Sequence, residues 1–218
     1  MRTRHERTWA LRQRRRFAQA LLRIGLRALI KLDLRCQTPI PPGPLVIAAN
    51  HLSHLDPLLL ITILDRPPEC AALSDLWHAL VAPFIWLYAP IAVQRDQADR
   101  HVIAQVLAAL AAGERVIIFP EAQISNTSGL TPARSGVGYL ALKTGVPVLP
   151  VAIYGTERAP QAWHRLRRAA VRITIGAPLR LGHTPQPRRE DRAAATAAIM
   201  HRIAALLPPV YRGVYSSL

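Results

Sequence analysis

The sequence predicts an α/β fold: a single domain in which a mainly parallel sheet is flanked by helices, preceded by a basic amphipathic helical arm. Short apolar runs of strand length alternate along the chain with longer segments of helical periodicity, and strands separated by helices pair in parallel. The charge is also uneven, because residues 1–35 carry 11 Arg or Lys against two acidic residues, whereas residues 36–156 carry six against eight. A slightly acidic centre with basic flanks indicates a protein that meets an anionic surface at its edges.

The arm is assigned to residues 1–37. Apolar residues recur at helical spacing among arginines between positions 7 and 34, the pattern of a helix lying in the plane of an anionic bilayer. A helix packed on its own domain, or a basic arm for nucleic acid, would show similar spacing. The membrane interpretation is favoured because no aromatic interleaving or nucleic-acid motif accompanies the arginines. We therefore expect an anionic membrane surface as a partner and no nucleic acid.

The domain is assigned to residues 38–218, and it begins with a proline-rich linker at residues 38–44. Strands are expected near residues 46–49, 71–73, 91–93, 116–119, 148–153 and 171–175. Helices are expected near residues 57–64, 76–88, 97–111, 135–144 and 189–207. No apolar run approaches the roughly 18 residues that a membrane span requires, and no signal-type segment follows the basic start.

The two cysteines, Cys36 and Cys70, are too few for a disulfide framework and lack metal-ligand spacing. The histidines show no metal-binding spacing either. We expect a reduced protein without metal or cofactor, bound peripherally at the cytoplasmic face of the cell membrane.

The candidate catalytic residues lie in the polar stretch at residues 50–57, directly after an apolar run of strand length. The carboxyl end of a strand is where open α/β folds keep their chemistry. Asp56 could orient the imidazole of His51 and leave its other ring nitrogen as a general base. In a continuous helix the two would lie about 140° apart, so the pair requires a turn. An Asp56 that only caps a helix beginning at Pro57, with His51 in a loop, fits the spacing equally well.

Three further segments place polar residues beside predicted strands. Arg95 ends one apolar strand, where it could bind a phosphate or pair with a neighbouring acid on the surface. Glu121 follows the buried run at residues 116–119, and a carboxylate there requires a hydroxyl, an Arg or backbone N–H groups as partners. Pro147 and Pro150 limit ladder bonding in another strand, which favours a sheet edge or the wall of a cleft. Taken singly, each segment fits a structural role.

In this order, the segments resemble the four blocks of the glycerolipid acyltransferase family. The blocks are Asn-His-x-Ser-x-x-Asp at residues 50–56, the strand ending in Arg95, Phe-Pro-Glu at 119–121 and Val-Pro-Val-x-Pro-Val at 146–151, and the resemblance covers about residues 40–180. Four ordered blocks are far more specific than any one motif.

The resemblance implies a membrane-associated acyltransferase. His51, held by Asp56, would deprotonate the free hydroxyl of a lysophospholipid, with lysophosphatidate as the default acceptor and phosphatidate as the product. The hydroxyl would attack the thioester of acyl-CoA or acyl-acyl-carrier-protein directly, which fits the absence of a Gly-x-Ser-x-Gly nucleophile motif. Arg95 would hold the acceptor phosphate, and Glu121 would line the acceptor site with Ser53 and Gln123.

The sequence departs from the family pattern after Phe-Pro-Glu, where Gly-Thr-Arg-Ser is usual. Ala122, Gln123 and Ile124 replace the Gly, the Thr and a second phosphate-binding Arg. Arg134, later in the same loop, would restore part of the lost charge. The loss of an Arg also keeps open a zwitterionic lysolipid or lyso-aminolipid as acceptor. A catalytically inactive lipid-surface binding protein is the other alternative, although such a protein has no chemical need for His51 and Asp56.

Overall fold

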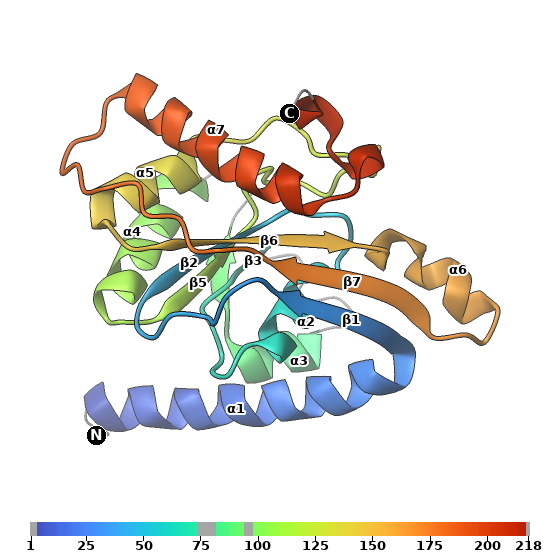
Figure 1. The fold of residues 1–218 in the computed structure, drawn as a ribbon. Coiled ribbons are helices and arrows are strands. Elements are labelled where there is room, and N and C mark those ends of the chain that lie inside the picture. The colour runs from blue at the N-terminus through green and yellow to red at the C-terminus, as the bar shows by residue number, and fades with distance from the viewer. Residues whose placement is uncertain (1–3, 74–81, 94–97, 217–218) are drawn as a thin grey trace.

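The computed structural model describes residues 4–73, 82–93 and 98–216, and it has the predicted α/β architecture (Figure 1). The strands are β1 (Ile30–Cys36), β2 (Leu45–Ala49), β3 (Ala71–Leu73), β4 (Ile91–Val93), β5 (Arg115–Ile118), β6 (Val148–Tyr154) and β7 (Ala169–Ile175). The α-helices are α1 (Arg4–Leu29), α2 (Asp56–Ile63), α3 (Ala82–Tyr88), α4 (Ala98–Ala111), α5 (Gly136–Thr144), α6 (Ala159–His164) and α7 (Arg189–Leu206). Short 3₁₀ turns lie at η2 (Thr156–Arg158), η3 (Pro209–Tyr211) and η4 (Gly213–Tyr215).

The main sheet has five strands in the order β1-β7-β6-β2-β5. β2 is buried along its whole length, as expected for a continuous apolar run at the centre of a parallel sheet. It pairs in parallel with β5 and with β6, whereas β6 and β7 run antiparallel. The carboxyl ends of β2, β5 and β6 therefore meet at one edge of the sheet, and the predicted polar segments follow two of these strands.

A second sheet of two parallel strands, β3 and β4, extends the layer beyond β5. The extension is made by Glu69, whose backbone N–H donates to Arg115 O at 2.6 Å and whose carbonyl accepts from Ile117 N at 2.9 Å. The chain from Glu69 into β3 thus lies beside β5 before it pairs with β4.

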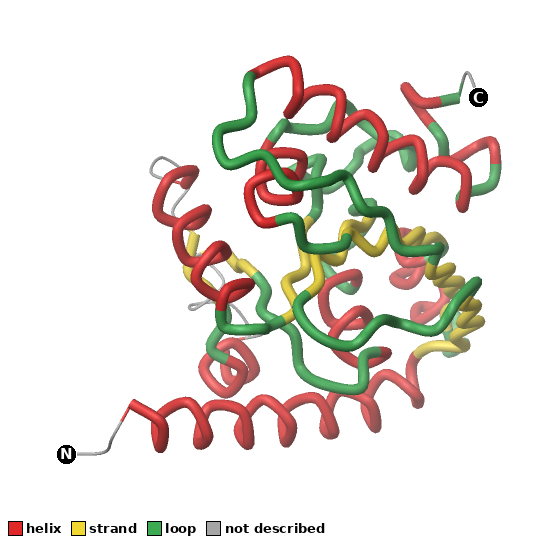
Figure 2. Tube along the Cα trace, turned by 60° about the vertical axis from the view of Figure 1, so that its left-hand side comes forward, coloured by secondary structure: helices red, strands yellow, loops and turns green. Residues whose placement is uncertain are grey.

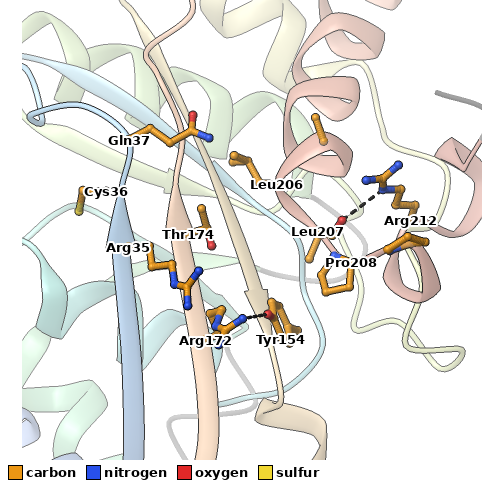
Figure 3. A pocket seen from close by; sticks show the side chains of 12 residues that line it. Arg35, Cys36, Gln37, Tyr154, Arg172, Thr174, Leu206, Leu207, Pro208 and Arg212 are labelled. Atoms are coloured by element: carbon orange, nitrogen blue, oxygen red, sulfur yellow. Dashed lines mark hydrogen bonds between the residues drawn. The ribbon is translucent and has the colours of Figure 1, made fainter.

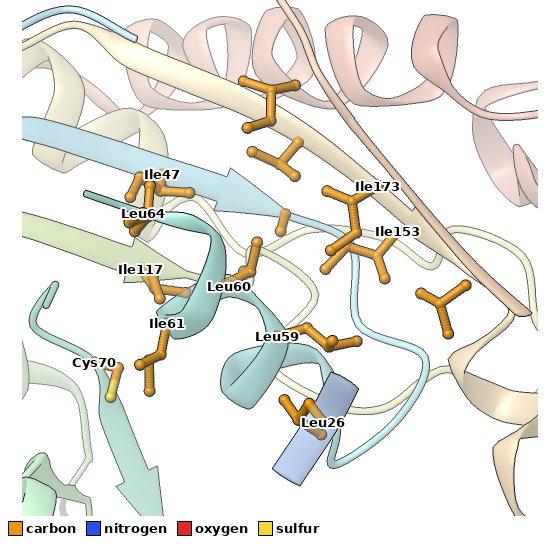
Figure 4. Packing of buried hydrophobic residues seen from close by; sticks show 14 of the residues in the cluster. Leu26, Ile47, Leu59, Leu60, Ile61, Leu64, Cys70, Ile117, Ile153 and Ile173 are labelled. Atoms are coloured by element: carbon orange, nitrogen blue, oxygen red, sulfur yellow. The ribbon is translucent and has the colours of Figure 1, made fainter. Parts of the chain in front are cut away.

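Helices cover both faces of the sheet and create two apolar cores. One core lies under α1, α2 and α6, and the other lies under α4, α5 and α7. In the first core, α2 is packed between the sheet and α1, with Leu59 and Leu60 buried near Ile47 and Leu26 (Figure 4). Burial of one such side chain stabilises the fold by about 1.5–3 kcal/mol. Figure 2 shows α1 running along one side of the molecule.

One prediction about the arm is corrected by the structure. The first helix ends at Leu29, not at residue 34, and residues 30–36 form β1, which pairs in parallel with β7. The segment Ile-Lys-Leu-Asp-Leu-Arg alternates apolar and charged residues, the period-two pattern of a strand. In the part of the chain that the structure describes, no helix is long and apolar enough to span a bilayer.

Pro147 precedes β6 and Pro150 lies within it. Of the two roles predicted for this strand, a sheet edge or the wall of a cleft, the sheet edge is wrong, because β6 lies between β7 and β2. The first pair of the β6–β7 ladder joins Val151 to Ile175. Pro150 lies just outside that ladder, so its missing N–H costs no strand pairing, and its carbonyl accepts from Gly176 N at 2.9 Å. The α6 helix was not expected from the sequence.

Candidate active site

The loop between β2 and α2 brings the two predicted catalytic residues together. His51 Nδ1 lies 2.9 Å from Asp56 Oδ2, so the turn that the spacing required is present. The N-cap of α2 is Leu55, which makes no side-chain cap bond. Asp56 is therefore the first helical residue, and the expectation that it caps a helix starting at Pro57 is wrong by one position. Its carboxylate points back into the loop instead.

The Asp56 carboxylate is fully buried, with 0% exposure, and its charge is balanced by four donors. Oδ2 accepts from His51 Nδ1 and from the backbone N–H groups of Leu52, at 2.6 Å, and Ser53, at 2.7 Å. Oδ1 accepts from the hydroxyl of Thr156 at 2.6 Å. Buried carboxylates are tolerated where hydrogen-bond donors satisfy their oxygens, as these four donors do.

This arrangement fixes the tautomer of His51. An ionised carboxylate only accepts hydrogen bonds, so Nδ1 carries the proton and Nε2 keeps a lone pair. The ring stacks on Phe119 with centroids 4.1 Å apart, and the side chain is 16% exposed. Nε2 has no hydrogen-bond partner among residues 4–73, 82–93 and 98–216. The imidazole is thus held in one orientation with its basic nitrogen open, the arrangement of a general base.

Glu121 supports His51 from below the loop. It is 3% exposed, and its Oε1 accepts from the backbone N–H of His51 at 3.0 Å. Its Oε2 accepts from both the N–H and the hydroxyl of Thr131, each at 2.7 Å. Glu121 therefore has the hydroxyl and backbone partners that its position required, and it holds the loop that carries His51. Its contact with an acceptor, implied by the family resemblance, remains a prediction.

Other contacts hold the backbone on either side of His51. The carbonyl of His51 accepts from Ser125 N at 2.8 Å, and the Ser125 hydroxyl donates to Gly129 O at 2.6 Å. Asn50 pairs with β6 as a strand residue would, donating to Ile153 O and accepting from Ile153 N at 2.8 Å each. The loop is thus fixed by segments about 70 and 100 residues later in the chain.

The remaining predicted site residues are placed less uniformly. Ser53 is half-buried at the pair itself, whereas Gln123 is exposed on the turn after Phe-Pro-Glu. Arg134 is exposed, and its backbone N–H donates to Pro120 O at 2.9 Å, so it lies beside that turn. Arg95 falls outside the described residues.

The turn after Phe-Pro-Glu keeps the conformation that a glycine would favour. Ala122 has a φ of 56°, in the left-handed region that costs a non-glycine residue about 1–2 kcal/mol. Its N–H donates to Phe119 O at 3.0 Å. The replacement of Gly therefore left this turn in place at a small cost in strain.

Sequence reasoning missed Thr156 and Thr131, which bind the two buried carboxylates. Thr156 lies two residues after the end of β6, at the same sheet edge as His51. The rule that carboxyl ends of neighbouring parallel strands meet could have found it once β6 was placed beside β2. Thr131 lies in a loop without regular structure, and no local pattern identifies it.

The α1 helix is tied to the elements around the site by polar side chains on its inner face. Gln19 donates to Ile61 O at 2.7 Å and Leu64 O at 2.9 Å, at the carboxyl end of α2. Arg15 is 7% exposed and binds both oxygens of Glu69. Carbonyl groups at a helix end require such donors, so α1 completes α2.

The outer face of α1 carries exposed apolar side chains interspersed with polar ones. Trp9 is 62% exposed, Phe17 59%, Leu21 49% and Ile24 69%, and these positions fall on one side of the helix at 3.6 residues per turn. Exposed arginines flank the stripe at positions 12, 14, 16 and 27. The Arg14 side chain reaches α3, where it donates to the carbonyl of Trp86, itself 64% exposed. An apolar stripe with basic borders is typical of a helix that lies on a membrane surface.

Comparison with known proteins identifies relatives of the domain. A family model described as Acyltransferase matches residues 31–154, a stretch that contains all four sequence blocks. A Mus musculus protein named 1-acyl-sn-glycerol-3-phosphate acyltransferase alpha is 29% identical over 131 residues, which is 57% of this chain and 45% of that protein. The chain thus spans less than half the length of this mammalian relative.

Bacterial relatives align over more of the chain. The 1-acyl-sn-glycerol-3-phosphate acyltransferase of Salmonella typhimurium is 24% identical over 184 residues, covering 81% of this chain and 75% of the relative. The crystal structure of the 1-acyl-sn-glycerophosphate acyltransferase PlsC from Thermotoga maritima superposes with a TM-score of 0.61 at 22% identity. That alignment covers 94% of this chain and 83% of the other, so the two proteins share a fold.

Proposed function

Because the chain belongs to the glycerolipid acyltransferase family, we propose that it transfers a fatty acyl group from a thioester to the free hydroxyl of lysophosphatidate, giving phosphatidate. The observation that carries this proposal is the His51–Asp56 pair, in which a buried carboxylate holds Nδ1 while Nε2 stays open. The names of the mouse and Salmonella relatives support the acceptor.

The chemistry requires one base and no covalent enzyme intermediate. Nε2 of His51 takes the proton of the acceptor hydroxyl while the hydroxyl oxygen attacks the thioester carbonyl carbon. The C–S bond then breaks, and the sulfur leaves with the proton that the imidazolium returns. Asp56 stabilises the positive ring between these steps. The donor is acyl-CoA or acyl-acyl-carrier-protein, which is a co-substrate, and no cofactor takes part.

The acceptor phosphate is assigned to Arg95, by family resemblance, and to Arg134. The position of Arg134 beside Pro120 supports this second assignment, since two cations suit the two charges of a phosphate monoester. Ile124, which stands where the family has an Arg, favours instead a second candidate: transfer to a zwitterionic lysolipid or a lyso-aminolipid.

An acylation assay separates these possibilities. Purified protein is given lysophosphatidate, lysophosphatidylethanolamine or a lyso-aminolipid, each with acyl-CoA and with acyl-acyl-carrier-protein. The proposal predicts the highest kcat/KM for lysophosphatidate. A preference for a zwitterionic acceptor would move the assignment to the second candidate. If no combination of donor and acceptor gives product, the chain is a lipid-binding protein without transferase activity.

We further assign α1 as the membrane-binding element, at the cytoplasmic face where anionic lipids attract basic segments. The exposed apolar stripe and its arginines support this assignment. Replacing Phe17 and Ile24 by Ser should weaken binding to anionic vesicles in a sedimentation assay, because both side chains would lose apolar burial in the bilayer. Val210→Ser is the matched control, as Val210 is 78% exposed beyond α7. Equal vesicle binding by the double variant and the control would remove the assignment.

A further inference from the structure

A pocket lies on the face of the sheet opposite α2, where β1, β7 and β6 meet the carboxyl end of α7 (Figure 3). Its volume is about 510 Å³, within the range of roughly 300–1,000 Å³ typical of small-molecule sites. Its lining comprises Arg35, Cys36, Gln37, Tyr154, Arg172, Thr174, Ala205, Leu206, Leu207, Pro208, Pro209 and Arg212. His51 and Asp56 do not belong to this lining, so the pocket is separate from the candidate active site.

The pocket is strongly basic. Arg35, Arg172 and Arg212 contribute three guanidinium groups, and the lining contains no acidic residue. Asp33 pairs with Arg172 at 2.6 Å and with Arg35 at 3.3 Å, whereas Arg212 forms no ion pair with a carboxylate among the described residues. Three guanidinium groups that share one paired carboxylate leave positive charge available at the pocket.

One of these arginines is held in a fixed orientation. Arg172 donates through Nε to Asp33 and through Nη1 to the hydroxyl of Tyr154, at 2.9 Å. Its guanidinium also lies over the Tyr154 ring, 5.8 Å from the centroid. The hydrogen bond to Asp33 raises the pKa of Arg172 most, and the hydrogen bond to Tyr154 raises it further. A rigid guanidinium with a remaining Nη2 donor is well suited to a phosphate oxygen.

The wall opposite the sheet is apolar. It is formed by Leu206 and Leu207 at the end of α7 and by the two prolines that follow. Arg212 is anchored at this wall by a hydrogen bond from Nε to Leu207 O at 3.1 Å, which leaves both Nη groups without a partner in the described part of the chain. Polar groups on one side and an apolar surface on the other suit an anion attached to a larger body.

We propose that this pocket binds the phosphate group of a small molecule whose body packs against the α7 wall. The nucleotide portion of coenzyme A and the glycerophosphate group of a lipid both carry a phosphate on a larger body. Free phosphate has the same charge but no such body. The site lies outside the proposed catalytic machinery, and its occupancy does not depend on acyl transfer.

The test is isothermal titration calorimetry on the full chain carrying His51→Ala, so that turnover plays no part. The probes are coenzyme A, glycerol 3-phosphate and inorganic phosphate. The test variant adds Arg35→Gln and Arg212→Gln, which removes two cations and leaves Arg172 with Asp33 and Tyr154. The matched control adds Arg202→Gln, an exposed arginine on α7 that does not line the pocket.

At least one probe should bind the parent saturably and bind the test variant about tenfold more weakly for each arginine lost. The Arg202 control should stay within about twofold of the parent. The probe that binds most tightly identifies the source of the phosphate. Equal affinity in the parent and the test variant would overturn the proposal, as would the absence of binding by all three probes to a parent that melts as the wild type does.

Discussion

Two largely buried pairs in the described part of the chain join a carboxylate to a basic side chain, and they differ in whether the basic group keeps a nitrogen without a partner. Asp56 holds His51, and Glu69 holds Arg15. Every guanidinium nitrogen of Arg15 has a partner: Nη1 and Nη2 bind Glu69, Nε donates to Tyr88 O at 2.9 Å, and Nη2 also donates to Ala89 O at 2.8 Å. The imidazole of His51 uses one nitrogen and leaves the other open.

The consequence of complete pairing is visible in the ionisation of Arg15. Burial alone would lower its pKa, but the hydrogen bonds and the charge of Glu69 raise it overall. Its guanidinium also lies over the Tyr88 ring, 5.3 Å from the centroid. This pair joins α1 to the strand beside β5 and to the end of α3. Burial and pairing therefore give structure, and a catalytic pair requires in addition one atom without a partner.

The largest expected effect is on the catalytic pair. Asp56→Asn should lower kcat/KM for lysophosphatidate by about a thousandfold to ten-thousandfold, because the amide no longer fixes the tautomer or stabilises the imidazolium. Initial rates of phosphatidate formation measure this loss. His54→Asn, at an exposed histidine of the same loop, is the control and should remain active. A loss below tenfold for Asp56→Asn would mean that the pair is not a catalytic unit.

Breaking the Arg15–Glu69 pair should lower the stability of the fold. Arg15→Gln should lower the free energy of unfolding by about 3–5 kcal/mol, since Glu69 is left buried without its partner. Arg15→Gln combined with Glu69→Gln should cost less than the single change. Denaturant titration measures both, with exposed Arg16→Gln as the control. If the double variant is less stable than the single variant, the buried charge is not the cause.

A smaller effect is expected at Thr156, which lies at the start of η2 and donates to the Asp56 carboxylate. Thr156→Val removes one donor to Asp56 Oδ1 and should lower kcat/KM by about tenfold, at the scale of one hydrogen bond to a charged group. Thr196→Val is matched, because Thr196 is also buried and donates to Arg192 O at 2.8 Å. Steady-state kinetics give kcat/KM for both variants. Equal values for Thr156→Val and Thr196→Val would assign Thr156 a packing role.

The smallest expected effect is on the pH dependence of stability, and it arises at Cys70, which follows Glu69 in the chain. Burial raises the pKa of the Cys70 thiol from 9.0 to about 12. Between these values the unfolded chain has lost the proton that the folded chain keeps, so stability falls as pH rises from 9 to 12. Unfolding titrations of Cys70→Ala across this range should show a shallower fall than the wild type. Parallel curves would show that the thiol does not contribute.

The local parts of this architecture could be predicted from the sequence, and the long-range parts could not. The apolar run of β2, the turn after it and the carboxylate five residues beyond His51 are local features, and the structure has all of them. The hydroxyl of Thr156 reaches Asp56 across 100 residues, and no periodicity carries that contact. The same limit explains why β6 was expected at a sheet edge. Prolines indicate weak strand pairing, but they do not indicate which strands lie on each side.

The error at residues 30–34 has a different origin. The alternation of Ile30, Leu32 and Leu34 with charged residues was present in the sequence, but it followed a long amphipathic helix without a Gly or Pro between them. Only the pairing of β1 with β7 shows where the helix ends. Burial of Arg15 was also hidden, because a run of arginines predicts a solvated face.

The most direct test of the account is the rate of phosphatidate formation by His51→Ala on vesicles containing lysophosphatidate and an acyl thioester. The account predicts a rate at least about a thousandfold below that of the wild type, with an unchanged melting temperature and unchanged vesicle binding. A folded, vesicle-bound His51→Ala protein that forms phosphatidate at the wild-type rate would contradict it.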